Sequence, residues 1–364
     1  MGPEPAVRSD ARLPKLDGLR GVAILMVLVC HYGFAPSIGQ AATTAFESFG
    51  FRFFASGVDL FFVLSGFLIG GILLDHRNSP KYFTSFYGRR VFRIFPVYYG
   101  FLLLTALVGV IQRARSSPTP VFDAGTPYWM YFAFLQNFSM GWFGDNTWIT
   151  VSMAWSLALE EQFYLTLPAA VKLVGRRSLV AISCLFVVAA PILRYFLPIA
   201  PHTFGVLVLA AMRADGLVAG FLCAVLVRSQ LKVSSDLLRL IAVLSAVFAV
   251  ATHLPNSPVD FLRGTSLAVL YSSVLLLATR GSFAILESAL LRFFGTISYS
   301  LYLFHQSALV LFRILAHHVG LVAAQGAGIV APVAALLASI VACWMLWIGL
   351  EKPLISWARQ RFRY

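Results

Sequence analysis

The apolar residues of this chain fill long stretches and do not alternate with polar residues on one face of each element. Each stretch extends over roughly 17 to 25 residues, the length that a helix needs to cross a bilayer. The pattern predicts an all-α fold, a polytopic membrane bundle of about ten transmembrane helices separated by polar residues, prolines and glycines. The predicted spans are residues 16–34, 56–74, 94–111, 151–171, 178–197, 204–227, 237–253, 264–280, 293–315 and 328–350.

The composition agrees with a membrane protein. Hydrophobic residues make up 59% of the 364 residues, and charged residues make up only 12%. Soluble domains carry about 25% charged residues, so a soluble globular enzyme is excluded.

The chain is also basic, with 28 Lys and Arg residues against 15 Asp and Glu residues and a formal net charge of +13. The basic residues concentrate in alternate short loops, and such loops remain on the cytoplasmic side during membrane insertion. Both the N- and the C-terminus are therefore predicted to be cytoplasmic, and the charge is attributed to topology and not to nucleic-acid binding. The predicted parts are an N-terminal tail over 1–15, a transmembrane domain over 16–351 and a basic C-terminal tail over 352–364.

Neither a disulfide framework nor a metal site is expected, because the cysteines show no Cys-x-x-Cys spacing and no neighbouring metal ligands. Each of the four lies in an apolar stretch: Cys30, Cys184, Cys223 and Cys343. The longest predicted outer segment runs from Gln112 to Thr150 and is rich in proline and in aromatic residues such as Trp142. It is expected at the membrane interface, either as an aromatic belt or as the lining of an acceptor cleft.

Ionisable residues inside membrane helices are costly, so each is a candidate functional residue. Arg20 and His31 are eleven positions apart, almost three helical turns, which places them on one helix face about 16 Å apart. The arginine is suited to hold phosphate and the imidazole to exchange a proton with a hydroxyl. An interfacial anchor and a hydrogen-bonded structural histidine are the alternatives.

Asp59 is predicted near the outer end of the second span, at a depth similar to that of His31. A His–Asp pair would fix the tautomer of the imidazole and leave its other nitrogen able to act as a base. Helix capping at Ser56 or Asp59 is the alternative. Gly66 and Gly70 have the small-xxx-small spacing that favours close helix packing.

Arg89, Arg90 and Arg93 lie at the inner edge between the second and third spans. Residues three or four apart share a helix face, so at least two guanidinium groups are expected to point the same way. They are suited to a phosphorylated ligand, and anchoring at the cytoplasmic interface is the alternative.

The fourth span contains two adjacent carboxylates, Glu160 and Glu161, of which one is expected to face the interior of the bundle. Arg213 and Asp215 are interpreted as an internal structural pair. His305 is interpreted as a hydrogen-bonded histidine of the bundle.

Five blocks of the chain resemble, in order, signatures of the acyltransferase-3 family of integral membrane acyltransferases. They are Leu16-Asp17-Gly18-Leu19-Arg20-Gly21 through His31, the run from Gly57 to Leu68, Arg90-Val91-Phe92-Arg93, Trp155-Ser156-Leu157 through Glu160 and Pro168, and the run from Ile297 to His305. The similarity extends over almost the whole chain.

The resemblance implies transfer of an acyl group, most often acetyl, from acyl-CoA to a hydroxyl of a carbohydrate, in a multi-pass protein of the bacterial inner (plasma) membrane. Surface polysaccharide and lipopolysaccharide are among the acceptors that the family uses. Together with the residue chemistry described above, the resemblance implies that the donor phosphates are bound by Arg20, Arg89, Arg90 and Arg93. It also implies that His31 is the catalytic base or acyl carrier and that Asp59 or Glu160 orients it. The expected partners are acyl-CoA, a hydroxyl acceptor and membrane lipid, with no nucleic acid and no metal.

Two alternatives remain open at this point. One is an acyltransferase that acts on a macrolide or another small metabolite. The other is a transporter of lipid-linked sugar, because intramembrane charges also mark translocation paths, although no inverted repeat is seen.

Overall fold

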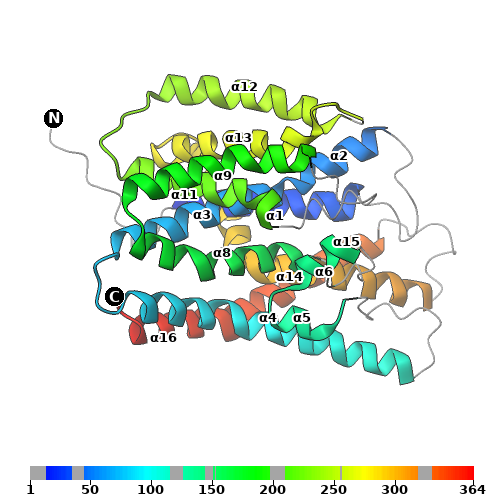
Figure 1. The fold of residues 1–364 in the computed structure, drawn as a ribbon. Coiled ribbons are helices and arrows are strands. Elements are labelled where there is room, and N and C mark those ends of the chain that lie inside the picture. Colours follow the sequence, from blue (N-terminus) through cyan, green and yellow to red (C-terminus); the bar gives the residue numbers. More distant parts are fainter. Residues whose placement is uncertain are drawn as a thin grey trace. The chain divides into compact units, whose positions relative to one another are not determined.

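A computed structural model describes residues 14–34, 45–114, 126–143, 151, 153–196, 210–254, 256–318 and 330–364. Every regular element within these residues is a helix, as predicted (Figure 1). The chain divides into two units, which are described one after the other. The first unit comprises Met1–Ser79 and Leu159–Thr296, and the second comprises Pro80–Ala158 and Ile297–Tyr364.

The first unit is a bundle in which long helices such as α3, α9, α11, α12 and α13 run side by side (Figure 1). Two helices, α8 (Ala154–Leu173) and α14 (Ala289–His318), belong to this unit only in part. Its own elements are α1 (Pro14–Val29), the π-turn η1 (Cys30–Phe34), α2 (Ala45–Ala55), α3 (Gly57–Asp75), α9 (Arg176–Phe196), α11 (Ala210–Val227), α12 (Ser235–His253), η2 (Asp260–Leu262), α13 (Arg263–Thr279) and η3 (Ala284–Glu287).

The second unit contains the remaining parts of α8 and α14 and has α16 packed along α4 (Figure 1). Its own elements are α4 (Tyr82–Ala114), α5 (Tyr128–Phe132), α6 (Gln136–Phe143), α15 (Val330–Leu346), the π-turn η4 (Trp347–Glu351) and α16 (Lys352–Arg361).

The closest helix packing in the first unit is made by glycine. A Cβ atom on Gly66 of α3 would overlap the backbone of Leu217 on α11, and one on Gly220 of α11 would overlap the backbone of Val63 on α3. Two helices that meet through glycine approach closely along their axes, which confirms the packing role predicted for Gly66. This contact holds the polar residues at the start of α3 and α11 against each other.

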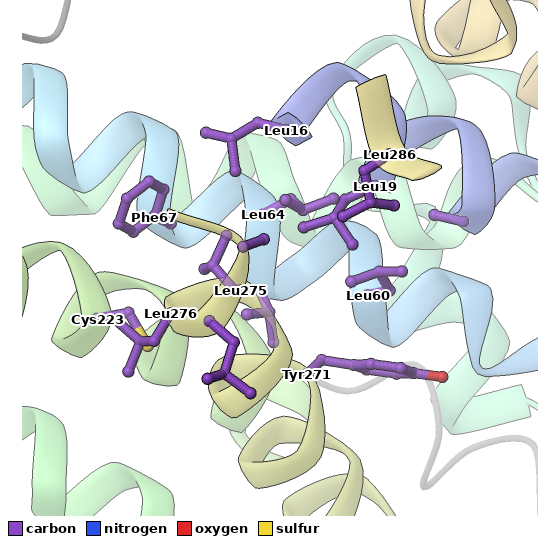
Figure 2. Packing of buried hydrophobic residues seen from close by; sticks show 14 of the residues in the cluster. Leu16, Leu19, Leu60, Leu64, Phe67, Cys223, Tyr271, Leu275, Leu276 and Leu286 are labelled. Atoms are coloured by element: carbon purple, nitrogen blue, oxygen red, sulfur yellow. The ribbon is translucent and has the colours of Figure 1, made fainter. Parts of the chain in front are cut away.

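Apolar side chains from α1, α3, α11, α12, α13 and η3 fill the core of the first unit. Figure 2 shows Leu60, Leu64 and Phe67 of α3 between Leu19 of α1 and Leu275 of α13. All five side chains are buried. Because leucine dominates this cluster, packing and dispersion stabilise it. The buried ion pairs of the unit lie near the helix ends.

Each of the ten predicted spans overlaps a helix, and within the described ranges seven helical segments are long and apolar enough to cross a membrane. The protein is a multi-pass membrane protein; ten crossings and cytoplasmic termini stay predictions. The helices α8, α11 and α14, each of which carries two Asp, Glu, Arg or His residues inside its predicted span, are not among the seven.

Several boundaries differ from the prediction. The helix α4 begins at Tyr82, twelve residues before the predicted membrane span, and it includes the arginine segment, for which helical spacing was expected. The predicted C-terminal tail is helical over Lys352–Arg361. Residues 1–13 of the predicted N-terminal tail and residues 115–125 and 144–150 of the aromatic segment lie outside the described residues.

Candidate active site

His31 lies in the π-turn that ends the first membrane helix, eleven residues after Arg20 in the same continuous helical segment. Nδ1 of His31 is 2.9 Å from the carbonyl oxygen of Val27, and the ring meets the edge of Phe51 at 6.2 Å between centroids. A carbonyl oxygen can only accept, so Nδ1 donates, and the lone pair of the neutral ring is on Nε2. The side chain is partly exposed, as a proton-exchanging group must be.

The π-turn itself is a local departure from α-helix that opens the hydrogen-bonding pattern around His31. Such turns occur mostly as single insertions and frequently at functional sites. The thiol of the preceding residue, Cys30, donates to the carbonyl of Phe51 at 3.4 Å, which ties α2 to the turn. His31 is thus contacted by the backbone of its own helical segment at Val27 and by the side chain of Phe51 on α2.

Glu160 is held by two hydroxyl groups of the first unit. Ser65 of α3 donates to Oε1 at 3.0 Å, and Tyr164, one turn later on α8, donates to Oε2 at 3.1 Å. Hydroxyl donors stabilise an ionised carboxylate and fix its plane. This confirms that one of the paired carboxylates on α8 faces a neighbouring helix of the bundle.

Asp59 forms a buried ion pair with Arg213 of α11, with 3.0 Å between Oδ1 and the guanidinium nitrogen. The exposed fractions of the two residues are only 5% and 7%. The predicted pairing of Arg213 with Asp215 is therefore wrong. Residues two apart point to different sides of a helix and cannot face each other.

Asp215 instead pairs with Arg194 of α9 at 2.7 Å. Thr265 of α13 donates to the same carboxylate at 2.9 Å and accepts from Arg194 at 2.7 Å. Sequence reasoning missed Arg194 and Thr265. An arginine late in an apolar span was a signal for the first, but nothing in the sequence indicates its partners.

The arginine segment belongs to the second unit and is divided in its contacts. Arg89 donates to the carbonyl of Phe362 at 2.7 Å and lies over the ring of Tyr364 at 4.8 Å. Arg90 lies over the ring of Phe86 at 5.8 Å. Arg93 is partly exposed and has no ion-pair partner within the described part of the chain. Arg89 thus anchors residues 362–364, while Arg90 and Arg93 stay candidates for phosphate binding.

The second unit has polar contacts of its own that the sequence did not reveal. Ser156 is 2.6 Å from the hydroxyl of Tyr302, and Ser300 donates to the buried carboxylate of Glu351 in the π-turn η4. His305 is fully buried, with Nδ1 2.7 Å from the carbonyl of Tyr302, which confirms its interpretation as a hydrogen-bonded histidine. Glu351 had been placed at the edge of a predicted tail, so its burial was not foreseen.

The structure assigns the predicted site residues to different units. Arg20, His31, Asp59 and Glu160 are in the first, and the segment Arg89–Arg93 is in the second. A common site formed by both groups stays a prediction. Within the described residues, no three His, Cys, Asp or Glu side chains gather as metal ligands would.

These observations define a polytopic helical membrane protein with an oriented histidine and buried ion pairs. Residues 13–348 match the model of the acyltransferase 3 family, which is described as an acyltransferase domain. The match extends over nearly all of the 364 residues, and the chain belongs to this family.

Several curated proteins are similar over part of the chain. The peptidoglycan O-acetyltransferase OatA of Listeria monocytogenes is 32% identical over 165 residues, 43% of this chain and 24% of that protein. The putative peptidoglycan O-acetyltransferase YrhL of Bacillus subtilis is 35% identical over 164 residues, 43% and 23% of the two chains. The O-acetyltransferase OatA of Staphylococcus aureus is 31% identical over 169 residues, 44% and 25%. The similarity thus covers about a quarter of each relative, and no solved structure matches the chain.

Proposed function

We propose that this protein transfers an acyl group, in the first instance acetyl, from acyl-CoA to a hydroxyl of a cell-wall or surface glycan at a bacterial plasma membrane. The observation that carries the proposal is the orientation of His31, whose proton on Nδ1 is directed to the backbone of Val27 and whose Nε2 can accept a proton. Family membership supports acyl transfer, and the similarity to peptidoglycan O-acetyltransferases favours peptidoglycan as the acceptor.

In this mechanism, Nε2 of His31 takes the proton of the acceptor hydroxyl. The oxygen attacks the thioester carbonyl, the carbon–sulfur bond breaks, and the proton passes from the imidazolium to the departing CoA thiolate. The products are an ester on the glycan and free CoA. The same nitrogen could first accept the acyl group itself and then pass it to the acceptor, which leaves the overall reaction unchanged.

Arg90 and Arg93 of α4 are proposed to bind donor phosphate at the cytoplasmic face, and Arg20 of α1 is a proposed donor-binding residue of its own unit. Coenzyme A is a polyanion, and guanidinium groups bind phosphate through paired, charge-assisted hydrogen bonds. Arg89 is left out of this set, because its guanidinium already holds Phe362 and Tyr364.

Glu160 and Asp59 receive different proposed roles. The backbone of Val27 already fixes the tautomer of His31, and Asp59 forms an ion pair with Arg213. The proposed role of Asp59 is therefore to stabilise the site and not to orient the imidazole. Glu160 accepts from Ser65 and Tyr164 and remains the proposed carboxylate partner of the reaction.

The test uses the purified full chain in detergent with radiolabelled acetyl-CoA and three acceptors: peptidoglycan fragments, a neutral polysaccharide and a macrolide. We expect label on the peptidoglycan fragments, and no label when His31 is replaced by Ala. Label on the macrolide alone would replace the glycan acceptor by a small metabolite. Absence of label on all three, with no binding of acetyl-CoA, would overturn the proposal.

A further inference from the structure

A second group of charged residues gathers at one end of the first unit, where α2 and the end of α12 approach the start of α13. It consists of Arg52 on α2, His253 at the end of α12 and Arg263 at the start of α13. The charges of Arg52, Arg263 and Arg213 act on the imidazole of His253, and those of Arg52 and Arg213 act on Arg263. Like charges are thus concentrated around one imidazole.

The described acidic residues nearby balance two of these arginines and leave Arg52 uncompensated. Asp59 is engaged by Arg213, and Asp260 pairs with Arg263. Arg52 is partly exposed and has no ion-pair partner within the described ranges of the chain. A cation that the protein leaves uncompensated at the edge of a buried ion-pair network favours an anion from outside.

His253 adds a second, independent requirement. The residue is fully buried; its Nδ1 lies 2.6 Å from the carbonyl of Ala249 and therefore donates to it. Its Nε2 has no hydrogen-bond partner among the described residues. A buried polar atom without a partner needs an explanation, and a neutral Nε2 accepts from a hydroxyl. The cluster thus matches a ligand group that carries both a negative charge and a hydroxyl.

This cluster is connected to His31 through three consecutive residues of α2. Phe51 packs on the ring of His31 at 6.2 Å between centroids, Arg52 follows, and Phe53 packs on the ring of His253 at 6.3 Å. Both histidines end helices that begin at the other end of the unit, where Lys15 pairs with Glu287. In the orientation predicted from charge, both lie towards the outer face, from which a glycan would approach.

We propose that Arg52 and His253, beside the ion pair of Arg263 with Asp260, form an acceptor subsite that binds a carboxylate-bearing sugar, with Arg52 on the carboxylate and Nε2 of His253 accepting from a neighbouring sugar hydroxyl. The inference rests on the proposed function, since it places the acceptor beside His31. It adds a substrate class, the acidic sugar, and residues outside the family signatures that recognise it.

The test measures binding, so that it does not depend on turnover. The probes are a peptidoglycan disaccharide and the same disaccharide with its carboxylates reduced to alcohols, titrated by calorimetry against the full chain in neutral detergent. We expect the acidic disaccharide to bind about tenfold tighter or more, because a charge-assisted hydrogen bond contributes at least that factor. Arg52→Gln should abolish the preference, and Arg52→Lys should restore part of it.

The matched control is Arg239→Gln, which removes one positive charge from the opposite end of α12, where Arg239 pairs with Asp236 on the surface. It should leave the preference intact. Equal binding of the two disaccharides, or an undiminished preference in Arg52→Gln, would overturn the subsite. Because both results are readable without acyl transfer, failure of the subsite is distinguished from failure of the proposed function.

A competing ligand is the headgroup of a bilayer lipid. An apolar cavity of about 220 Å³ between α12 and α13, lined in part by Phe248, Leu262 and Val269, offers space for an acyl chain beside Arg263. Phosphatidylglycerol is therefore added to the detergent as a competitor. If it displaces the acidic disaccharide in the wild type and binds more weakly to Arg52→Gln, the ligand is the lipid headgroup and the acceptor subsite is overturned.

Discussion

Nδ1 of His31 donates to the carbonyl oxygen of Val27 at 2.9 Å, within the helical segment that ends in the π-turn Cys30–Phe34. The backbone of the same helix therefore selects the tautomer, a task that sequence reasoning assigned to Asp59 or Glu160. Because Nδ1 carries the donated proton, the lone pair of the neutral ring is on Nε2. The proposed base is thus preorganised by one turn of helix.

Breaking the ion pair between Asp59 and Arg213 should destabilise the protein. Arg213→Leu leaves the buried carboxylate without its cation, an effect of roughly 3 to 5 kcal/mol for a buried pair. We expect a clear fall in the melting temperature in detergent. The double variant Asp59→Leu/Arg213→Leu should recover much of the loss, and a single variant that melts like the wild type would show that the pair does not stabilise the bundle.

Replacing Glu160 by Gln should reduce acyl transfer and leave donor binding unchanged. The substitution removes the charge that Ser65 and Tyr164 stabilise, and losing such charge-assisted contacts slows the reaction by about tenfold to a hundredfold. The measurement is kcat and KM for acetyl-CoA. A change in KM alone would show that Glu160 contributes to donor binding and not to the chemical step.

The arginines of α4 should separate into two functional groups. Arg93→Ala is expected to weaken binding of acetyl-CoA by about tenfold to a hundredfold, the effect of one charge-assisted phosphate contact. Arg89→Ala should leave this affinity nearly unchanged and instead release residues 362–364 to proteolysis, because Arg89 holds Phe362 and Tyr364. Equal losses of affinity in the two variants would show that Arg89 also binds the donor.

The membrane orientation is testable by labelling single cysteines from either side. In a variant that lacks the four native cysteines, a cysteine at position 89 should react only from the cytoplasmic side and one at position 142 only from outside. The variant must first be shown to transfer acetyl groups. Reaction of both positions from the same side would refute the predicted topology and a donor route that crosses the bilayer.

The helices of this protein could be predicted from its sequence, because apolar stretches long enough for a bilayer leave few alternatives. The prediction failed where polar residues extend a helix. The start of α4 at Tyr82 and the continuation of α16 to Arg361 both lie in charged segments that resemble loops. The π-turn around His31 also has no sequence signature.

The candidate site was predictable only residue by residue. Arg213 was recognised as an internal charge, but its partner Asp59 is more than 150 positions away in the sequence and faces it only because Gly66 and Gly220 allow α3 and α11 to approach closely. Arg194 and Thr265 were missed for the same reason. Contacts between distant helices depend on packing that one sequence does not encode visibly.

The most direct test of the central claim compares acetyl transfer by the wild type, His31→Gln and His76→Gln. His76 is a matched control, because its Nδ1 makes the same contact with the carbonyl four residues earlier, Ile72, at 2.9 Å, at the opposite end of α3 from Asp59. We expect kcat to fall by about a hundredfold to ten-thousandfold in His31→Gln, the contribution of a general base, and to stay unchanged in His76→Gln. Turnover of His31→Gln close to that of the wild type would contradict the account.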